Sequence, residues 1–232
     1  MGKSAFVHIQ DAGGRIQLYF QKNRLGDESF DGFIALFDLG DFLGVEGTLF
    51  TTRTGEVTLR VIAYRMLSKS LRPLPEKFHG LTDPETRYRQ RYLDLIANED
   101  VRRTFEIRTA VTPTIRHFLD DRGYLEVETP ILQPVYGGAS ARPFTTHYNA
   151  LGEDLYLRIA DELYLKRLII GGMERVYEFC KDFRNEGIDR THSPEFTMLE
   201  GYEAYADHRN IMEMVEQMIA AVATAVHGGP VM

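Results

Sequence analysis

The stretch from Arg175 to Tyr205 constrains the fold of this chain more than any other part of its sequence. Two runs, 176–184 and 195–205, alternate around aromatic residues, and the polar segment 187–194 between them ends in a proline. Two alternating runs joined by a short polar loop are typical of paired strands. The sequence therefore predicts an antiparallel hairpin in this region.

The two predicted strands place charged and aromatic side chains together. Because side chains alternate between the faces of a strand, Arg184 and Glu186 share one face of the first strand. An arginine fork suits a carboxylate or a phosphate, a glutamate suits an ammonium group, and a phenylalanine stacks on a flat ring. A solvated face with Arg–Glu pairs is one interpretation; the flanking apolar residues favour a lined pocket instead. One face of the second strand carries Phe196, Met198, Glu200 and Tyr202.

The wording of this hairpin resembles a known family. FRNE, followed by a loop, a histidine and PEFTMLE-x-Y, is similar to motif 2 of class II aminoacyl-tRNA synthetases, and specifically of the lysyl-tRNA synthetases. The segment 123–130 likewise resembles motif 1, the dimer-forming element of that class. The resemblance implies an α+β chain: an incomplete N-terminal OB-fold barrel, then part of a class II antiparallel-sheet catalytic domain.

Composition and charge limit the partners. The chain has 232 residues and a net charge of −7, and no apolar run approaches the ~20 residues of a membrane span. Residues 1–80 are nearly balanced in charge and residues 81–232 are acidic, so neither part has the basic excess of a protein held to RNA by charge alone. The single cysteine, Cys180, excludes an intrachain disulfide, fits a cytoplasmic location, and is predicted to be a small buried hydrophobic residue.

Residues 4–65 read as short strands with one helical interruption, at 30–36. Turn signals at 11–14 and 51–55 separate alternating runs, which predicts a small Greek-key barrel of the oligonucleotide-binding type. From the residues alone Phe6 fits a core position; the resemblance instead implies that Phe6, Gln17 and Glu56 contact the anticodon. We expect an OB-fold domain at 1–70 whose first strand is missing, a linker at 71–98, and a partial catalytic domain at 99–232.

The second half of the chain has clear helix and strand signals. An apolar stripe predicts a helix over 101–122, with a kink or break at Pro113 because proline removes a hydrogen bond. We expect strands at 124–129 and 155–159, and helices capped by Asp161 and Asp207. The last of these helices has an apolar stripe that we expect to lie in the core: Ile211, Val215, Met218 and Val222.

The resemblance also implies a reaction and a set of site residues. ATP, with Mg²⁺ as cofactor, would activate lysine as lysyl-adenylate, and a homodimer joined through 123–130 would transfer the lysyl group to tRNA(Lys). Arg184 and Glu186 would be catalytic, and Arg184, Glu186, His192 and Phe196 would bind ATP. The lysine-binding residues would be Gly138, Glu162, Arg184, Glu200 and Tyr202.

Three departures qualify this expectation. The family position of Ser193 is expected to be asparagine, Pro113 is unexpected in its helix, and no Lys or Arg follows Arg209. The arginine of motif 3 and the metal ligands near it would then lie outside this chain, so we expect a fragment without metal ligands. A non-catalytic tRNA anticodon-binding module is the alternative function. A paralogue that lysylates a translation factor is disfavoured, because those relatives lack the barrel predicted at 4–65.

Overall fold

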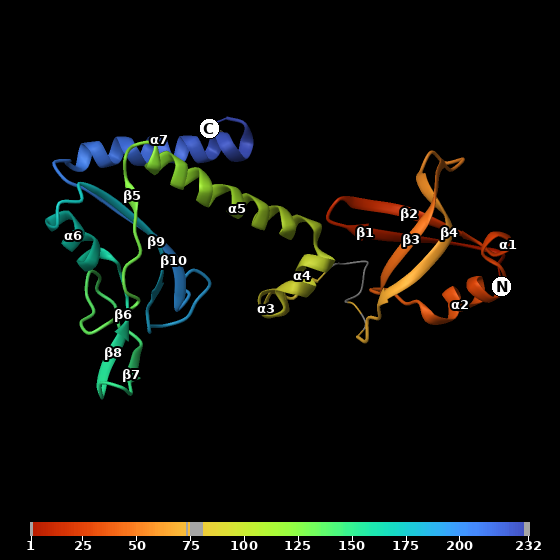
Figure 1. Cartoon of the computed structure of the whole chain (residues 1–232), viewed down its shortest axis with the longest axis horizontal. Helices are drawn as coiled ribbons and strands as arrows, with labels where there is room; N and C mark the ends of the chain where they lie inside the picture. The colour runs from red at the N-terminus through yellow and green to blue at the C-terminus, as the bar shows by residue number, and fades with distance from the viewer. Residues whose placement is uncertain (1, 73, 75–80, 230–232) are drawn as a thin grey trace. The chain divides into compact units, whose positions relative to one another are not determined.

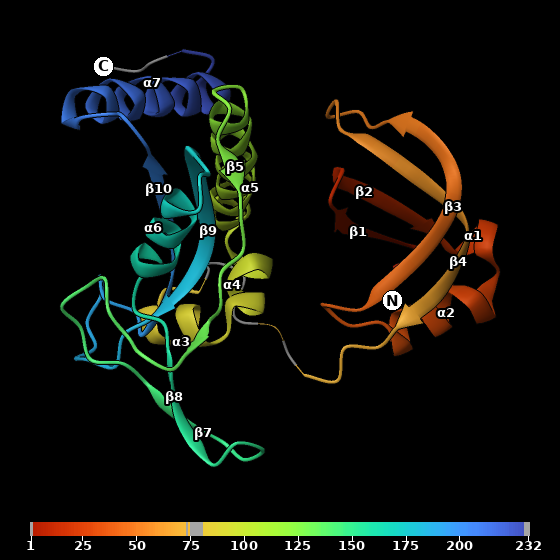
Figure 2. The same ribbon diagram turned by 60° about the vertical axis from the view of Figure 1, so that its left-hand side comes forward.

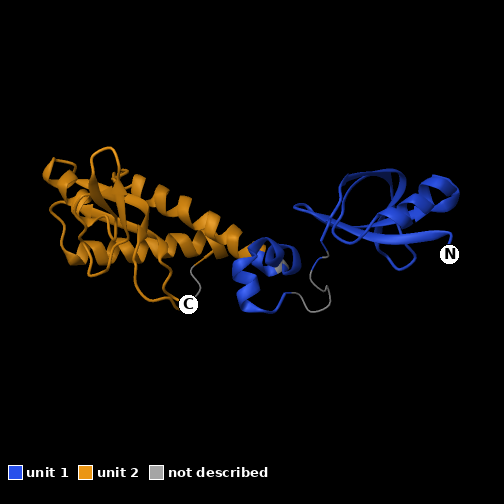
Figure 3. Cartoon of the chain, turned by 90° about the horizontal axis from the view of Figure 1, so that it is seen from below, with its two compact units in different colours: residues 1–101 blue, residues 102–232 orange. Residues whose placement is uncertain are grey.

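The computed structural model describes residues 2–72, 74 and 81–229. The chain divides into two compact units, residues 1–101 and 102–232 (Figure 3). Each has its own hydrophobic core, and each is described separately below. Among the described residues, no helix combines the length and apolarity that crossing a bilayer requires.

The first unit is built on a four-stranded sheet. Strands β1 (Ser4–Asp11) and β2 (Gly14–Gln21) form a hairpin, and β3 (Phe42–Thr51) pairs antiparallel with β4 (Val57–Ser68). Strand β2 also pairs with β4 in parallel, which gives the order β1-β2-β4-β3. Helices α1 (Lys22–Leu25) and α2 (Asp27–Leu36) connect β2 to β3 (Figure 1). This order of strands and helices agrees with the predicted oligonucleotide-binding barrel, although the sheet is not closed among the described residues.

The core of this unit lies under α2. Phe20 stacks on Phe33 with ring centroids 3.9 Å apart, and Leu18 and Val61 are fully buried beside them. Phe6 points the other way and is 56% exposed, so its interpretation as a core residue is wrong. Its exposure follows from strand alternation, because the β1 side chains that pack on the core are Ala5, Val7 and Ile9.

Two short helices end the first unit, within the linker predicted at 71–98. Helix α3 (Pro84–Arg89) is capped by Asp83, whose carboxylate accepts the backbone N–H of Thr86. In α4 (Arg91–Ala97) the fully buried Asp94 binds Arg87 at 2.8 Å and also pairs with Arg91. Arg87 and Arg91 are therefore committed to structural ion pairs.

The second unit is centred on the predicted hairpin. Strands β9 (Arg175–Phe183) and β10 (Glu195–Glu203) pair antiparallel along nine residues each, as predicted. Strand β5 (Leu125–Glu126) joins β9 in parallel, so this sheet is mixed rather than wholly antiparallel. A smaller sheet, in the order β6-β8-β7, holds β6 (Leu132–Gln133), β7 (Thr145–Tyr148) and β8 (Glu153–Leu157).

The two faces of the hairpin have different neighbours. Tyr177 and Phe179 belong to the core that includes Phe118 of α5 (Glu99–Asp120) and Met218 of α7 (His208–His227). Both helices are labelled in Figure 2. The opposite face meets α6 (Glu162–Ile170) and the turn before it. Alternation thus gives the hairpin one apolar face and one polar face.

Several local predictions are corrected by the structure. Helix α5 continues through the exposed Pro113, so the predicted break is wrong. The strand predicted at 124–129 is shorter, because Thr129 donates its N–H and hydroxyl to the Glu178 carboxylate instead of continuing the ladder. The stripe predicted for α7 is wrong at Val215, which is 41% exposed, although Met218 is buried.

The predicted N-caps have different outcomes. Asp207 accepts the N–H groups of Arg209 and Asn210 and forms a capping box with Asn210, as expected for a true N-cap. Asp161 occupies the N-cap position of α6, but its side chain makes no capping hydrogen bond. It is instead buried against Cys180, which gives this carboxylate a different role.

Candidate functional site

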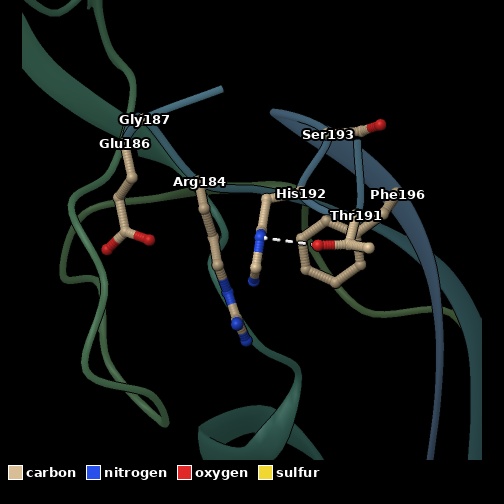
Figure 4. A pocket seen from close by; sticks show the side chains of 7 residues that line it. All are labelled: Arg184, Glu186, Gly187, Thr191, His192, Ser193 and Phe196. Atoms are coloured by element: carbon tan, nitrogen blue, oxygen red, sulfur yellow. Dashed lines mark hydrogen bonds between the residues drawn. The ribbon is translucent and has the colours of Figure 1, made fainter. Parts of the chain in front are cut away.

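A pocket of about 280 Å³ opens at the loop end of the hairpin (Figure 4). Arg184 lies at its centre, between Glu186 and His192. Its guanidinium carbon is 5.0 Å from the centroid of the Phe196 ring, and two of its nitrogens donate to the carbonyl of Ile159, each at 3.3 Å. The pocket is lined by Arg184, Glu186, Gly187, Thr191, His192, Ser193 and Phe196.

The loop over this pocket is held by Asp189. This carboxylate accepts the backbone N–H groups of Thr191 at 2.7 Å and His192 at 2.8 Å, and its other oxygen is 2.7 Å from Nδ1 of His192. These hydrogen bonds lower the pKa of Asp189. The exposed imidazole of His192 is therefore presented over the pocket by a carboxylate that stays ionised.

Glu186 connects the pocket to the glycine-rich loop at 136–143. The N–H of Arg142 donates to the Glu186 carboxylate at 3.3 Å, and the N–H of Asn185 donates to the Arg142 carbonyl at 2.7 Å. The structure thus joins the FRNE turn to a loop that lies more than 40 residues earlier in the sequence.

The residues predicted to bind an amino acid gather beside this pocket. Gly138 has a positive φ of 87°, and a Cβ there would lie 2.9 Å from the Cβ of Glu162, so loop and helix are in close contact. Glu162 forms an ion pair with Lys166 at 2.5 Å, and Lys166 lies 5.8 Å from the Tyr202 ring centroid. Burial raises the pKa of Glu200, which accepts a 3.4 Å hydrogen bond from the Tyr202 hydroxyl.

Sequence reasoning missed a buried polar cluster on the same face of the hairpin. It consists of Arg158, Asp161, Glu178, Cys180 and Asp182, and each of them is at most 6% exposed. The prediction that Cys180 is buried is confirmed, but its Sγ lies 2.7 Å from Asp161 Oδ2 rather than among apolar side chains. Alternation from Arg184 back to Asp182, Cys180 and Glu178 was the signal that these residues share the pocket face.

The first unit carries a second group of predicted site residues. Glu56 accepts a 2.8 Å hydrogen bond from Gln17 and lies 3.0 Å from Nε2 of His8. Phe6 stacks on Tyr19 with ring centroids 4.5 Å apart, on the same outer face of β1 and β2. The described structure therefore brings Gln17 and Glu56 into direct contact and leaves an exposed aromatic ring close to them. His8, Arg15, Gln17, Glu56 and Val57 line a hollow of about 460 Å³.

One group of described residues has side chains of the kinds that ligate metal ions. The ligand atoms of Asp161, Cys180 and Asp182 lie within 4.8 Å of one another. A thiol is a poor ligand for Mg²⁺, and Nε of Arg158 lies 3.4 and 3.6 Å from the two carboxylates. This cluster therefore does not fit Mg²⁺.

Known protein families match both parts of the chain. Residues 83–231 match the family model described as tRNA synthetases class II (D, K and N), and residues 1–67 match an OB-fold nucleic acid binding domain. The lysine–tRNA ligase of Clostridium novyi is 60% identical over 98% of this chain and 44% of its own length. That of Nitrosomonas europaea is 59% identical over 98% of this chain and 45% of its own length.

The chain thus spans less than half the length of these curated relatives. The family match covers most of the chain and includes the hairpin that lines the pocket, the glycine loop and α6. We conclude that this chain belongs to the class II tRNA synthetases of the aspartate, lysine and asparagine group, with an OB-fold domain at its N-terminus.

Proposed function

We propose that the chain functions in lysine–tRNA ligation: ATP-dependent formation of lysyl-adenylate and transfer of the lysyl group to tRNA(Lys). The observation that carries this proposal is the position of Arg184. Its guanidinium lies over the Phe196 ring, and Arg184 is on the same face of the sheet as Glu200 and Tyr202. The arrangement supports the proposal because one cation lies next to a candidate adenine platform, on the sheet face that also carries the candidate amino-acid residues.

The first chemical step would join the lysine carboxylate to the α-phosphate of ATP and release pyrophosphate. Phe196 would stack on adenine, and His192 and Glu186 would position the nucleotide. Arg184 would bind both the carboxylate and the α-phosphate and neutralise the charge that develops between them. No covalent enzyme intermediate is required, so positioning and electrostatics supply the catalysis.

Recognition of the amino acid would use negatively charged side chains, which bind its ammonium groups. Glu162, beside the backbone of Gly138, would accept the α-ammonium group of lysine. Glu200 and Tyr202 would line the channel for the lysine side chain. In the second step a ribose hydroxyl of tRNA would attack the lysyl carbonyl and AMP would leave.

The test is lysine-dependent exchange of pyrophosphate into ATP, with the purified chain and Mg²⁺. Loss of one preorganised cation costs about 100-fold or more in rate, so we expect Arg184→Ala to abolish measurable exchange. Arg190→Ala is the matched control, because Arg190 lies in the same loop but does not line the pocket. A folded wild-type chain without exchange would contradict the catalytic part of the proposal for these 232 residues.

A tRNA-binding role of the first unit has its own support. Gln17 keeps one amide N–H beyond its bond to Glu56, and Glu56 offers an acceptor, a pattern that matches the O4 and N3–H edge of uracil. The exposed Phe6 ring would stack on the base. We expect Phe6→Ala to weaken binding of a UUU anticodon hairpin by about 1–3 kcal/mol and not to affect pyrophosphate exchange. Unchanged RNA affinity would contradict specific readout.

We also propose a cytoplasmic homodimer joined through 123–130. Strand β5 is at the edge of its sheet and Leu125 is 53% exposed, so this segment has surface available for a second copy. Sedimentation of the wild-type chain and of Leu125→Asp tests this contact. A wild-type chain that remains monomeric at high micromolar concentration would contradict it.

A further inference from the structure

The buried polar cluster on the pocket face of the hairpin is held by one arginine, Arg158. Nη1 of Arg158 binds Glu178 at 2.6 Å, while its Nε lies 3.4 Å from Asp161 and 3.6 Å from Asp182. The other oxygens of Asp161 and Asp182 have different surroundings. Asp161 Oδ2 accepts the Cys180 thiol at 2.7 Å, and Asp182 Oδ2 is buried without any hydrogen-bond partner.

The charges of this face do not balance. Four carboxylates lie on this face, from β9, β10 and the turn before α6. Among the described residues, the guanidiniums of Arg158 and Arg184 are the cations next to them, since Lys166 pairs with Glu162. Uncompensated buried charge is costly, so such a cluster must take up a proton or a cation. The four carboxylates are those of Asp161, Glu178, Asp182 and Glu200.

The ionisation behaviour of the two aspartates agrees with the geometry. Burial raises the pKa of Asp161 to about 7, and the neighbouring Asp182 carboxylate adds to this rise. Burial also raises the pKa of Asp182, against the opposing effect of Arg158. At neutral pH the pair therefore holds a proton for part of the time. Asp161 Oδ1, which also has no hydrogen-bond partner, is a further buried acceptor in the pair.

The two aspartates are connected to three residues of the proposed amino-acid site. Asp161 directly precedes Glu162, and its backbone acts on Glu200 by lowering the pKa of that carboxyl group. Asp182 lies two residues before Arg184 on the same face of β9. A change in the charge of the pair is therefore felt at the groups that would bind the ammonium and carboxylate of an amino acid.

We infer that Asp161 and Asp182 are positioning residues that share one proton in the empty site and release it to solvent when a cationic amino acid binds. The side-chain ammonium group of the ligand keeps its own proton and replaces the released one as the neutralising charge. Lysine is thereby selected over a neutral side chain of similar length. The inference rests on the proposed amino-acid site, and it adds to that site a basis for choosing a cation.

The test is carbon-13 NMR of the aspartate carboxyl groups in the full chain, titrated with and without L-lysine. Without ligand we expect one carboxyl signal that titrates near neutrality and is lost in both Asp161→Asn and Asp182→Asn. Asp121→Asn is the matched control, because it removes the same charge from an exposed position near the end of α5. Saturating lysine should move this titration to lower pH, and norleucine, the neutral analogue, should not.

A competition measurement gives the size of the effect. Asp182→Asn should reduce the preference for lysine over norleucine by about tenfold, the ratio expected on removal of one partly screened charge. The inference is overturned if no aspartate titrates between pH 5 and 8, or if lysine leaves the titration unchanged. Pyrophosphate exchange separates failure of this inference from failure of the proposed catalysis. If the chain is active but its aspartate titration does not change with lysine, the proton release alone is refuted. If the chain is inactive but the titration does change, only the catalytic proposal is refuted.

Discussion

At the scale of single residues, Gly138 is fixed by two separate constraints. Its φ of 87° is in the left-handed region, and a Cβ would lie 2.9 and 3.2 Å from the Cβ atoms of Glu162 and Ala160. We expect Gly138→Ala to lower the free energy of unfolding by about 1–3 kcal/mol and to raise the KM for lysine, because Glu162 must move away. Urea unfolding and lysine-dependent exchange measure the two effects.

Gly152→Ala is the matched control for this prediction. Gly152 also has a positive φ, 66°, but nothing lies within 4 Å of the position of its missing Cβ. It should therefore show only the cost of the backbone conformation, about 1–2 kcal/mol, with an unchanged KM. Equal effects of the two substitutions on KM would show that the contact with Glu162 has no functional weight.

The buried aspartates predict how stability depends on pH. A carboxyl whose pKa is about 7 when folded and 3.8 in the reference state binds more protons in the folded protein between these values. The contribution of Asp161 to the free energy of unfolding therefore falls as pH rises from about 4 to 7. We expect Asp182→Asn to flatten this fall, because it removes the negative charge beside Asp161. Urea unfolding at pH 5 and pH 8 checks this. The prediction is contradicted if unit 102–232 of the wild-type chain is more stable at pH 8 than at pH 5.

The roles of residues could be predicted where charged side chains occupy alternate positions of a predicted strand. Arg184 and Phe196 were expected on one face, and the structure places the guanidinium over the ring. Asp161 and Cys180 were assigned simpler roles, an N-cap and a small hydrophobic residue, because each is common in that local context. Their contact joins a helix start to a strand 19 residues later, and no local pattern reports such a pairing.

At the scale of elements, α5 keeps its helical path through Pro113. Proline cannot donate to the carbonyl four residues earlier, at Thr109, yet the helix is continuous because its C-terminal half packs Phe118 and Leu119 into the core. We expect Pro113→Ala to raise the free energy of unfolding by about 1–3 kcal/mol. This gain is reduced because alanine gives the unfolded chain more conformational entropy than proline does.

Calorimetry of the two variants tests this prediction. Pro84→Ala is the control, because Pro84 is at the first position of α3, where no intrahelical N–H bond is lost. It should give no gain in stability. A loss of stability in Pro113→Ala would mean that the proline fits the local geometry of α5 and is not strained there.

Elements were predicted best where periodicity was long. The hairpin of nine paired residues and the capped helix α7 were located to within about two residues by alternation and by the Asp207 cap. Strand β5 was overestimated, because its extent depends on a side-chain acceptor, Glu178, that is about 50 residues away. The predicted buried face of α7 was partly wrong for a similar reason. Whether Val215 is buried or exposed is decided by tertiary packing and not by helical spacing.

At the scale of the whole molecule, two cores serve two different candidate ligands. The core around Phe20 and Phe33 supports the surface of Phe6, Gln17 and Glu56, and the core around Tyr177 and Met218 supports the pocket of Arg184. With a net charge of −7, nonspecific attraction to RNA is weak, so the first surface must rely on stacking and base contacts. Each ligand should therefore stabilise chiefly the unit that holds its site.

Hydrogen exchange resolves this prediction element by element. A UUU anticodon hairpin at 100 times its Kd should raise the protection of β1–β4 by about 2.7 kcal/mol and leave β9 and β10 unchanged. ATP with lysine should do the reverse, because the ring of Phe196 and the carboxylate of Glu200 belong to β10. A hairpin with CCC in place of UUU is the matched RNA control, since cytosine presents no N3–H to Glu56. Protection of both units by either ligand would show instead that the two cores unfold as one cooperative body.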